Sequence, residues 1–166
     1  QSGDTEILSK MRRNYNADQY KHIARRAADR IPSIGLGADV IVGFPSESEE
    51  NFESTRRLIE ELPFSYLHVF SYSPRSGTEA HNFKNNIKNI TKKERNLILS
   101  NLVKKKAHLF HKSFIGKKVT VLIEERKQAD GPLKGHSEHY IPVRIDTNVA
   151  LQNQLVTVLI TEVQKN

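Results

Sequence analysis

The spacing of hydrophobic residues in the first half of the chain alternates between helix and strand. Apolar positions at helical spacing predict an amphipathic helix over residues 17–30, which Pro32 ends. The apolar runs 38–43 and 66–72 are rich in β-branched and aromatic residues, which is typical of strands buried on both faces of a parallel sheet. Residues 52–62 carry a helical apolar face between the two runs. The pattern therefore predicts a strand–helix–strand unit with a right-handed crossover.

Two candidate capping boxes mark where further helices should begin. Ser46 with Glu49 follows the turn after the first strand, and Thr91 with Glu94 opens a long helix. The residues before this long helix, 75–89, are polar and rich in Asn and Gly, so they predict a loop. The strand–helix–strand unit is thus expected to end before the long helix starts.

Beyond Gly116 the pattern changes to short strands. Alternation of polar and apolar residues predicts strands over 118–124 and 154–162, with another over 140–145. Several short strands in one stretch predict a small β-barrel, a separate domain of the nucleic-acid-binding sort. The first half offers only two strands, which cannot close a barrel. We therefore expect it to be a cut piece of a larger α/β domain whose other strands lie upstream.

Positive charge is concentrated in one block. The whole chain carries a net charge of +7. Residues 84–118 hold eleven Lys and Arg residues against the single acid Glu94, a net charge of +10, which leaves −3 for the rest of the chain. Such a block points to a polyanion such as nucleic acid, although a solvated helix face would have the same composition.

Composition also excludes several kinds of chemistry. The chain has no cysteine, which rules out disulfides, a thiol nucleophile and a cysteine-ligated cluster within this stretch. The seven histidines show no HxxxH or HxH spacing that would suggest a metal site. No apolar run approaches the roughly 20 residues that span a bilayer, and residues 1–4 do not resemble a signal peptide. We expect a cytoplasmic protein without a membrane partner, and the first residue, Gln, suggests truncation.

Four stretches, read in chain order, carry a resemblance to one family. They are residues 1–3 with 11–15 (QSG…MRRNY), 39–52 (DVIVGFPSESEENF), 72–80 (YSPRSGTEA) and the tail 114–163. Together they resemble the methylthiotransferases of the radical-SAM superfamily, and the tail resembles their TRAM domain, a small RNA-binding barrel. The chain departs from the family pattern where Ser46 replaces the usual Gly and Asn51 replaces the usual Asp.

The resemblance implies an α/β fold with a small all-β domain. Residues 1–90 would be the C-terminal part of a radical-SAM (βα) partial TIM barrel, 91–114 a connecting basic helix, and 115–166 a TRAM β-barrel. The family also implies that the full-length parent uses S-adenosylmethionine and two [4Fe–4S] clusters. The cysteines that bind such clusters are absent from this chain. The fragment alone is therefore expected to be inactive, and it offers no catalytic or metal-binding residue.

The implied activity is attachment of a methylthio group to C2 of N6-threonylcarbamoyladenosine, next to the anticodon of tRNA. Residues 66–75 look most like that branch of the family. Branches that act on isopentenyladenosine in tRNA or on a ribosomal-protein aspartate are the alternatives. A non-catalytic RNA-binding module and a generic α/β enzyme with a basic tail are readings from other classes. The expected partners are tRNA, the missing N-terminal portion of the same protein and, because of an exposed sheet edge, a second copy of the fragment.

The cofactor is expected at the carboxyl ends of the strands, where barrels bind their ligands. Gly43 would let the backbone approach a ligand, although residues 43–45 also fit a simple tight turn. The resemblance favours the ligand site, for which the expected residues are Gln1, Ser2, Gly3, Arg13, Ile41, Val42, Gly43, Tyr72 and Ser73. Glu49 and Glu50 are expected to stabilise a helix N-terminus, whereas the role of Glu47 is left open.

Cations mixed with aromatic rings predict the RNA contacts. Lys and Arg would bind phosphates, and rings would stack on bases, as in other small barrels. The residues expected to bind RNA are Arg75, Lys104, Lys105, Lys117, Lys118, Lys134, His136, Tyr140 and Arg144. A solvated barrel surface would show the same spacing, and the neighbouring basic block favours RNA.

Overall fold

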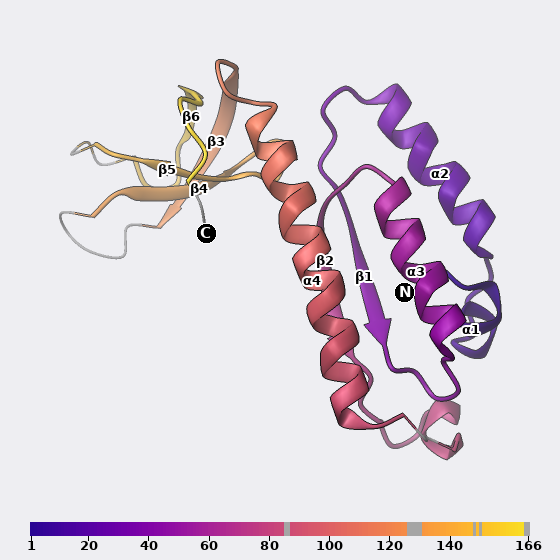
Figure 1. Ribbon diagram of the computed structural model, residues 1–166. Coiled ribbons are helices and arrows are strands. Elements are labelled where there is room, and N and C mark those ends of the chain that lie inside the picture. Colours follow the sequence, from indigo (N-terminus) through magenta and orange to yellow (C-terminus); the bar gives the residue numbers. More distant parts are fainter. Residues whose placement is uncertain (85–86, 126–130, 148, 150, 165–166) are drawn as a thin grey trace. The chain divides into compact units, whose positions relative to one another are not determined.

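The computed structural model describes residues 1–84, 87–125, 131–147, 149 and 151–164, and the chain forms two compact units (Figure 1). Unit 1 is Gln1–Ala107 and unit 2 is His108–Asn166. The division falls within the long helix α4 (Asn89–Lys112). The chain is a mixed α/β protein, as the sequence predicts. Among the helices described, none is long and apolar enough to cross a membrane.

Unit 1 is built around one parallel strand pair. Its elements before α4 are α1 (Thr5–Lys10), α2 (Ala17–Arg30), β1 (Leu36–Val42), α3 (Glu49–Glu61), β2 (Phe64–Ser71) and the 3-10 helix η1 (Glu79–Asn82). The parallel pairing of β1 with β2 confirms the predicted strand–helix–strand unit, and α2 matches its predicted bounds. Both strands begin two residues before the predicted runs. The predicted loop 75–89 contains η1, and residues 85–86 lie outside the described ranges.

Hydrophobic spacing misses the short helix α1. Asp4 caps this helix, because its Oδ1 accepts a hydrogen bond from the Ile7 N–H at 3.0 Å. Ile7 and Leu8 are fully buried. The helix has only six residues, less than two turns, so no apolar periodicity can develop along it.

The N-cap of helix α3 is Ser48, two residues later than the predicted N-cap Ser46. Ser48 Oγ accepts from the Asn51 N–H at 3.2 Å, and Asn51 Oδ1 accepts from the Ser48 N–H at 2.8 Å. The predicted box of Ser46 and Glu49 is wrong, because Ser46 has a φ of 66° whereas an N-cap residue needs extended backbone. Asn51, which departs from the family pattern, is a capping residue here.

Exchanging Ser46 for glycine is expected to stabilise unit 1 by about 0.5–1 kcal/mol, because glycine adopts positive φ without steric cost. The Ser46 hydroxyl accepts a hydrogen bond from Lys10 Nζ at 2.9 Å, an exposed contact whose loss costs little. Ser54→Gly is the matched control, since Ser54 lies inside α3, where glycine is expected to cost about 0.5–1 kcal/mol. Thermal unfolding followed by circular dichroism measures both, and a lower melting temperature for Ser46→Gly would show that the turn is not strained.

Helix α4 begins earlier than predicted. Its first residue is Asn89, and the Lys92 N–H already donates to the Lys88 carbonyl at 3.2 Å. The predicted capping box of Thr91 and Glu94 is therefore wrong, because both residues lie inside the helix. Asn89 and Ile90 extend the helix before Thr91, and Ile90 is 59% exposed, so neither residue adds to a buried apolar stripe.

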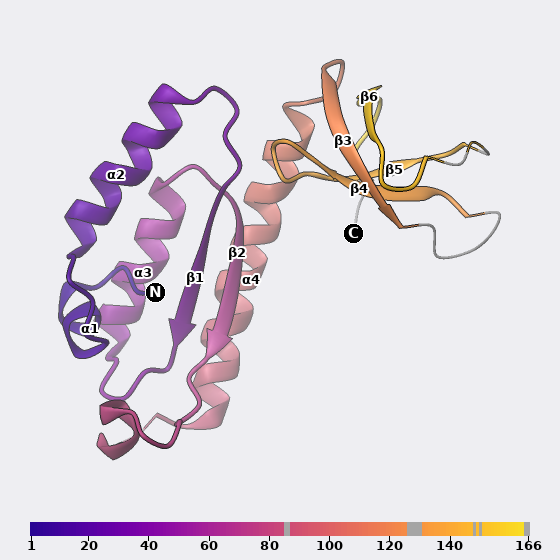
Figure 2. The same ribbon diagram turned by 180° about the vertical axis from the view of Figure 1, so that it is seen from behind.

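The two faces of the strand pair differ. Alternate residues of β1, Val40 and Val42, are buried among side chains of α3 and α4 such as Leu99. Figures 1 and 2 show both helices on the same face of the sheet. On the opposite face Asp39 is exposed and Phe70 is 51% exposed. The prediction that both strands are buried on both faces is therefore wrong for the described residues.

Unit 2 is a four-stranded antiparallel sheet in the order β5-β4-β3-β6. The strands are β3 (Lys118–Glu125), β4 (Leu133–Ser137), β5 (Pro142–Ile145) and β6 (Leu155–Leu159). One face packs into a core formed by Phe114, Val119, Val121, Ile123, Leu133, Ile141 and Val143. The predicted run of short strands is confirmed, and its closure into a barrel stays a prediction.

Three strands of unit 2 depart from the hydrophobic pattern. Alternation misses β4, because its inward positions include the small residues Gly135 and Ser137. The strand predicted over 140–145 begins only at Pro142, because Tyr140 has a φ of 60° and lies in the turn. The strand predicted over 154–162 is confined to Leu155–Leu159.

Candidate functional site

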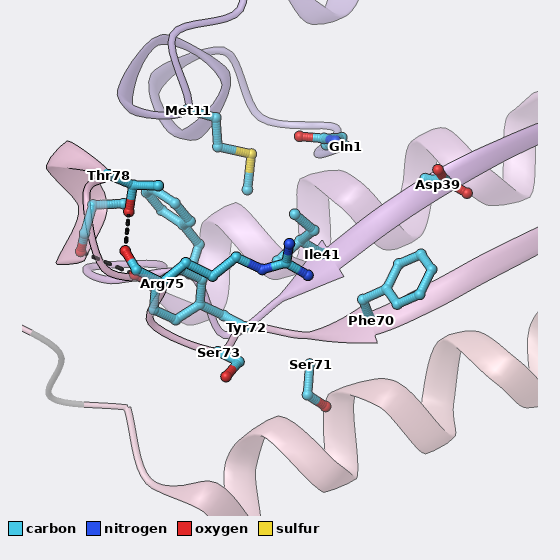
Figure 3. Close-up of a pocket in the computed structure, with 12 residues that line it drawn as sticks. Gln1, Met11, Asp39, Ile41, Phe70, Ser71, Tyr72, Ser73, Arg75 and Thr78 are labelled. Atoms are coloured by element: carbon cyan, nitrogen blue, oxygen red, sulfur yellow. Dashed lines mark hydrogen bonds between the residues drawn. The ribbon is translucent and has the colours of Figure 1, made fainter.

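A cavity of about 510 Å³ opens near the carboxyl ends of β1 and β2 (Figure 3). Its walls come from the N-terminal segment, the two strands and the segment that follows β2. The carboxyl ends of parallel strands are where α/β enzymes bind their ligands. The volume also lies in the range that small-molecule sites occupy. This cavity is therefore the candidate ligand site of unit 1.

Several residues predicted from the sequence line this cavity. They are Gln1, Ile41, Tyr72 and Ser73 from the cofactor set and Arg75 from the RNA set. Figure 3 shows Arg75 extending from the rim toward Ile41. The Thr78 hydroxyl donates to the Arg75 carbonyl at 2.8 Å, which fixes this part of the rim. The structure thus groups Arg75 with the predicted cofactor residues.

Most of the apolar wall of the cavity could not be predicted from the sequence. Met11, Phe44 and Phe70 line it, and Asp39 adds a carboxylate. Phe70 is the register partner of Ile41, so the two side chains lie beside each other on the same face of the sheet. The alternation of side chains along β2 could have indicated on which face of the sheet Phe70 lies. It could not have indicated that Ile41 is its neighbour on β1.

Gln1 lies beside β1, to which a backbone hydrogen bond joins it. The Ile41 N–H donates to the Gln1 carbonyl at 3.0 Å. The Gln1 side chain is oriented by Arg13, whose Nε donates to Gln1 Oε1 at 3.1 Å. Arg13 itself does not line the cavity, so its observed contact is to the Gln1 amide.

Three other predicted cofactor residues, Ser2, Gly3 and Val42, do not line the cavity but hold together the segments that surround it. The Gly3 N–H donates to Thr55 Oγ1 at 2.9 Å, and Ser2 Oγ lies 3.1 Å from the same atom. A Cβ on Gly3 would lie 2.6 Å from the Thr55 Cα, so glycine is needed for this close approach to α3. The Val42 side chain is fully buried, and its carbonyl accepts from the Tyr72 N–H at 2.9 Å.

Gly43 is packed closely by Lys92 of α4. Its φ is 71°, and an added Cβ would lie 2.4 Å from Lys92 Cγ. Lys92 is buried, and its Nζ donates to the Tyr72 carbonyl at 3.3 Å. The same Nζ lies 5.4 Å from the centroid of the Tyr72 ring. Lys92 thereby contacts the residues that follow both strands, and its side chain fills the space beside Gly43.

A buried ion pair holds the turn between β1 and α3. Arg95 Nη1 donates to Glu47 Oε2 at 2.6 Å, with side-chain exposures of 7% and 1%. The same carboxylate oxygen accepts from the Gly43 N–H at 2.7 Å. Burial raises the pKa of Glu47, and the Gly43 N–H and Arg95 oppose that rise. Glu49, in the first turn of α3, accepts from Arg95 Nη2 at 2.9 Å.

The cations of the basic block do not form one continuous exposed surface. Lys92 and Arg95 are each only 6% exposed. Lys106 Nζ donates to a backbone carbonyl of α3 at 2.8 Å, and burial lowers the pKa of this amine. Lys104 and Lys105 of α4 are exposed, as an RNA contact requires. The charge count of the block therefore overstates the positive charge that a polyanion could reach.

Unit 2 brings four predicted RNA contacts close together. Lys134 on β4 and Arg144 on β5 are register partners. The rings of His136 and Tyr140 stack with centroids 5.2 Å apart and planes inclined by 22°. The remaining predicted contacts of this unit, exposed at the start of β3, are Lys117 and Lys118.

Comparison with known proteins gives relatives along nearly the whole chain. No protein-family model matches it. The tRNA-2-methylthio-N(6)-dimethylallyladenosine synthases of Oceanobacillus iheyensis and Geobacillus kaustophilus are each 40% identical over 163 residues, which is 98% of this chain and 31% of each relative. The threonylcarbamoyladenosine tRNA methylthiotransferase MtaB of Rickettsia prowazekii is 40% identical over 151 residues, 91% of this chain and 34% of that relative. The chain thus spans about a third of the length of these curated relatives.

Proposed function

This chain is a homologue of the tRNA methylthiotransferases over nearly its whole length, and on that premise we propose that it is the C-terminal part of such an enzyme. The parent would attach a methylthio group to C2 of a modified adenosine in tRNA by radical-SAM chemistry. The homology carries the proposal, and the cavity at the strand ends supports it. The alternative is a non-catalytic RNA-binding module.

The cavity fits part of a site for S-adenosylmethionine. Ile41 and Phe70 offer adjacent apolar side chains for a nucleobase, while Gln1, Asp39 and Arg75 offer polar groups for a ribose or an amino-acid moiety. The face of β1 and β2 opposite α3 and α4 would then be the inner face of a partial TIM barrel, closed by strands from outside this chain. When bound, the cofactor supplies the radical chemistry of the family. The chain's own residues bind it and orient it.

The iron–sulfur clusters of the proposed parent need ligands from outside this chain. The chain has no cysteine, and its described residues hold no group of three or more His, Asp or Glu that could bind a metal ion. We therefore propose that residues 1–166 alone do not catalyse the reaction. Their contribution would be one wall of the cofactor site and an RNA-binding surface.

The RNA-binding role is proposed for unit 2 and for the exposed lysines of α4. Lys134 and Arg144 lie side by side on the sheet, and His136 of β4 stacks on Tyr140 of the turn that follows β4. Cations beside exposed rings suit contact with phosphates and bases. The small sheet would correspond to the TRAM domain of the family.

The substrate base is proposed to be N6-threonylcarbamoyladenosine. Residues 66–75 resemble that branch most closely. A relative named for threonylcarbamoyladenosine and two named for dimethylallyladenosine have the same 40% identity, so overall identity does not favour either base. Isopentenyladenosine (dimethylallyladenosine) therefore stays the alternative substrate, and a ribosomal-protein aspartate the more distant one.

The proposed function is tested by measuring the modified nucleosides in the tRNA of cells that express the full gene containing this segment. In bacteria whose own tRNA methylthiotransferase genes are deleted, we expect 2-methylthio groups to return to N6-threonylcarbamoyladenosine. Mass spectrometry of nucleosides from total tRNA measures the product. Methylthiolated dimethylallyladenosine would favour the alternative branch, and tRNA without any methylthio group would contradict the enzyme assignment.

A matched pair of variants ties this activity to the cavity. Ile41→Glu is expected to abolish the product, because it places a carboxylate against the apolar wall proposed for the nucleobase. Ile23→Glu is the control, because Ile23 lies on α2, is 64% exposed and does not line the cavity. Equal amounts of product from both variants, at equal protein levels, would show that the cavity is not part of the cofactor site.

A further inference from the structure

A second, smaller cavity adjoins the candidate ligand site of unit 1. Its volume is about 280 Å³, and residues 10–12 and 77–80 form its walls. Met11, Thr78 and Ala80 also line the larger cavity, so the two cavities lie side by side. Figure 3 shows Met11 and Thr78 at the edge of the larger cavity. We call the smaller cavity the rim pocket. A molecule bound in the larger cavity could extend a substituent into it.

The walls of the rim pocket carry two cations and one acid. Lys10 and Arg12 come from the end of α1, and Glu79 comes from η1. Arg12 Nη2 lies 2.5 Å from Glu79 Oε2. Lys10 Nζ donates to Glu6 Oε1 at 2.7 Å and to Ser46 Oγ at 2.9 Å. A guanidinium has five N–H donors in a planar fork, so the contact with Glu79 leaves donors for a second carboxylate.

Arg12 occupies a backbone position where glycine is usual. The Arg13 N–H donates to the Leu8 carbonyl at 3.0 Å and the Arg12 N–H to the Ser9 carbonyl at 2.9 Å, which closes α1 as a Schellman motif. Arg12 is the left-handed residue of this motif, with a φ of 57°. A side chain is strained in this conformation, and strained residues cluster at functional sites. Glycine would end the helix with less strain, which favours a role for the guanidinium in the rim pocket.

The proposed substrate carries a carboxylate near its reacting carbon. The methylthio group is added at C2 of the adenine, and N1 lies between C2 and C6, the carbon that bears the N6 substituent. A substituent that turns toward N1 therefore leaves the base on the same edge as C2. In N6-threonylcarbamoyladenosine this substituent ends in a carboxylate, whereas a dimethylallyl group is uncharged. With C2 at the larger cavity, the substituent could enter the adjoining rim pocket.

We propose that the rim pocket binds the carboxylate of the N6 substituent of the substrate adenosine, with Arg12 as its ion-pair partner and Lys10 as the second cation. Binding would replace the contact of Arg12 with Glu79, two side chains that are 76% and 51% exposed and therefore able to separate. This inference rests on the proposed function and makes Arg12 a specificity-determining residue. A dimethylallyl group would offer neither cation a partner.

The test uses the purified full-length enzyme and two anticodon stem–loops that differ in one group. One stem–loop carries N6-threonylcarbamoyladenosine, and the other carries its methyl ester, in which the carboxylate has lost its charge. Mass spectrometry of the nucleosides gives the initial rates of methylthiolation. We expect kcat/KM to be at least about tenfold lower for the ester, because the charge-assisted hydrogen bonds to Arg12 are lost.

Arg12→Gly should lower kcat/KM for the acid at least about tenfold and leave kcat/KM for the ester unchanged. Glycine suits this helix end, so the melting temperature should not fall. Arg12→Asn, which also tolerates a positive φ, should show the same loss. Ser33→Gly is the matched control, because Ser33 has a φ of 59° but lines neither cavity. It should relieve similar strain without changing the preference for the acid.

The outcomes separate this inference from the proposed function. If the enzyme methylthiolated neither stem–loop, both proposals would be overturned. Equal kcat/KM for the acid and the ester would overturn the rim pocket as a carboxylate site and leave the enzyme assignment intact. Equal losses on both stem–loops in Arg12→Gly would assign the guanidinium to an RNA phosphate instead. A raised KM for S-adenosylmethionine with an unchanged preference for the acid would assign it to the cofactor.

Discussion

Exchanging Arg95 for methionine is expected to destabilise unit 1 by about 3–5 kcal/mol, the usual cost of removing one partner of a buried ion pair. The change leaves the Glu47 carboxylate, 1% exposed, without its guanidinium partner. Glu47 Oε1 has no hydrogen-bond partner within the described part of the chain, so the two bonds to Oε2 offset the burial of this charge. Chemical denaturation of the two proteins measures the difference.

The loss should depend on pH in a defined direction. In Arg95→Met, burial raises the pKa of Glu47 and no guanidinium opposes the rise, so the folded state holds the proton more tightly than the unfolded chain does. The destabilisation is therefore expected to be smallest at acidic pH and to grow as the pH rises through that raised pKa. Adding Glu47→Gln should recover much of the loss at neutral pH, because Gln can still accept from the Gly43 N–H without a charge.

Arg56→Met is the matched control for this prediction. Arg56 also contacts two carboxylates, Glu53 and Glu60, but on the exposed surface of α3. Ion pairs of this kind contribute little to stability. An equal effect of Arg56→Met and Arg95→Met, or a loss that does not vary with pH, would show that the buried pair does not hold the turn.

The second large effect is expected at Gly135. Its exchange for alanine should destabilise unit 2 by about 3 kcal/mol or more, because the new Cβ would lie 1.9 Å from the Leu122 carbonyl oxygen. That oxygen belongs to the backbone of β3, which pairs with β4, so neither strand can move aside without breaking the ladder. Hydrogen exchange should show lost protection in β3 and β4 and unchanged protection in α3.

Gly116→Ala provides the comparison within the same unit. Gly116 has a φ of 80°, but an added Cβ would have no described heavy atom within 4 Å. Its cost should be only the backbone strain of about 1–2 kcal/mol. If both glycine variants lost stability equally, the close approach of β4 to β3 would not be what requires glycine.

The sequence predicts the elements whose hydrophobic pattern lies within a single stretch of the chain. Helix α2 repeats its apolar spacing over 14 residues, and the strands around α3 follow from short apolar runs. The predicted helix starts fail for a different reason. A capping residue is defined by its backbone conformation, and the positive φ of Ser46 cannot be derived from the residue types of its neighbours.

The candidate site depends on relations between distant parts of the chain, which no local pattern contains. Ile41 and Phe70 become neighbours through the register of two strands, and Gln1 lies beside β1 through a single backbone hydrogen bond. The charge pattern of the basic block likewise cannot reveal that Lys92 and Arg95 point into unit 1. The family motifs indicated the strand ends near which the cavity lies, but they could not separate side chains that line the cavity from those that pack around it.

The most direct test of the central proposal is binding of the whole chain to unmodified tRNA and to single-stranded DNA of equal length, measured across a salt series. We expect a preference for tRNA that persists at moderate salt, because stacking on unit 2 adds to the phosphate contacts. If both polymers bound equally well and the affinity fell steeply with salt, the interaction would be nonspecific electrostatic attraction. That result, or no binding of tRNA, would contradict the assignment of this chain as the RNA-binding part of a tRNA methylthiotransferase.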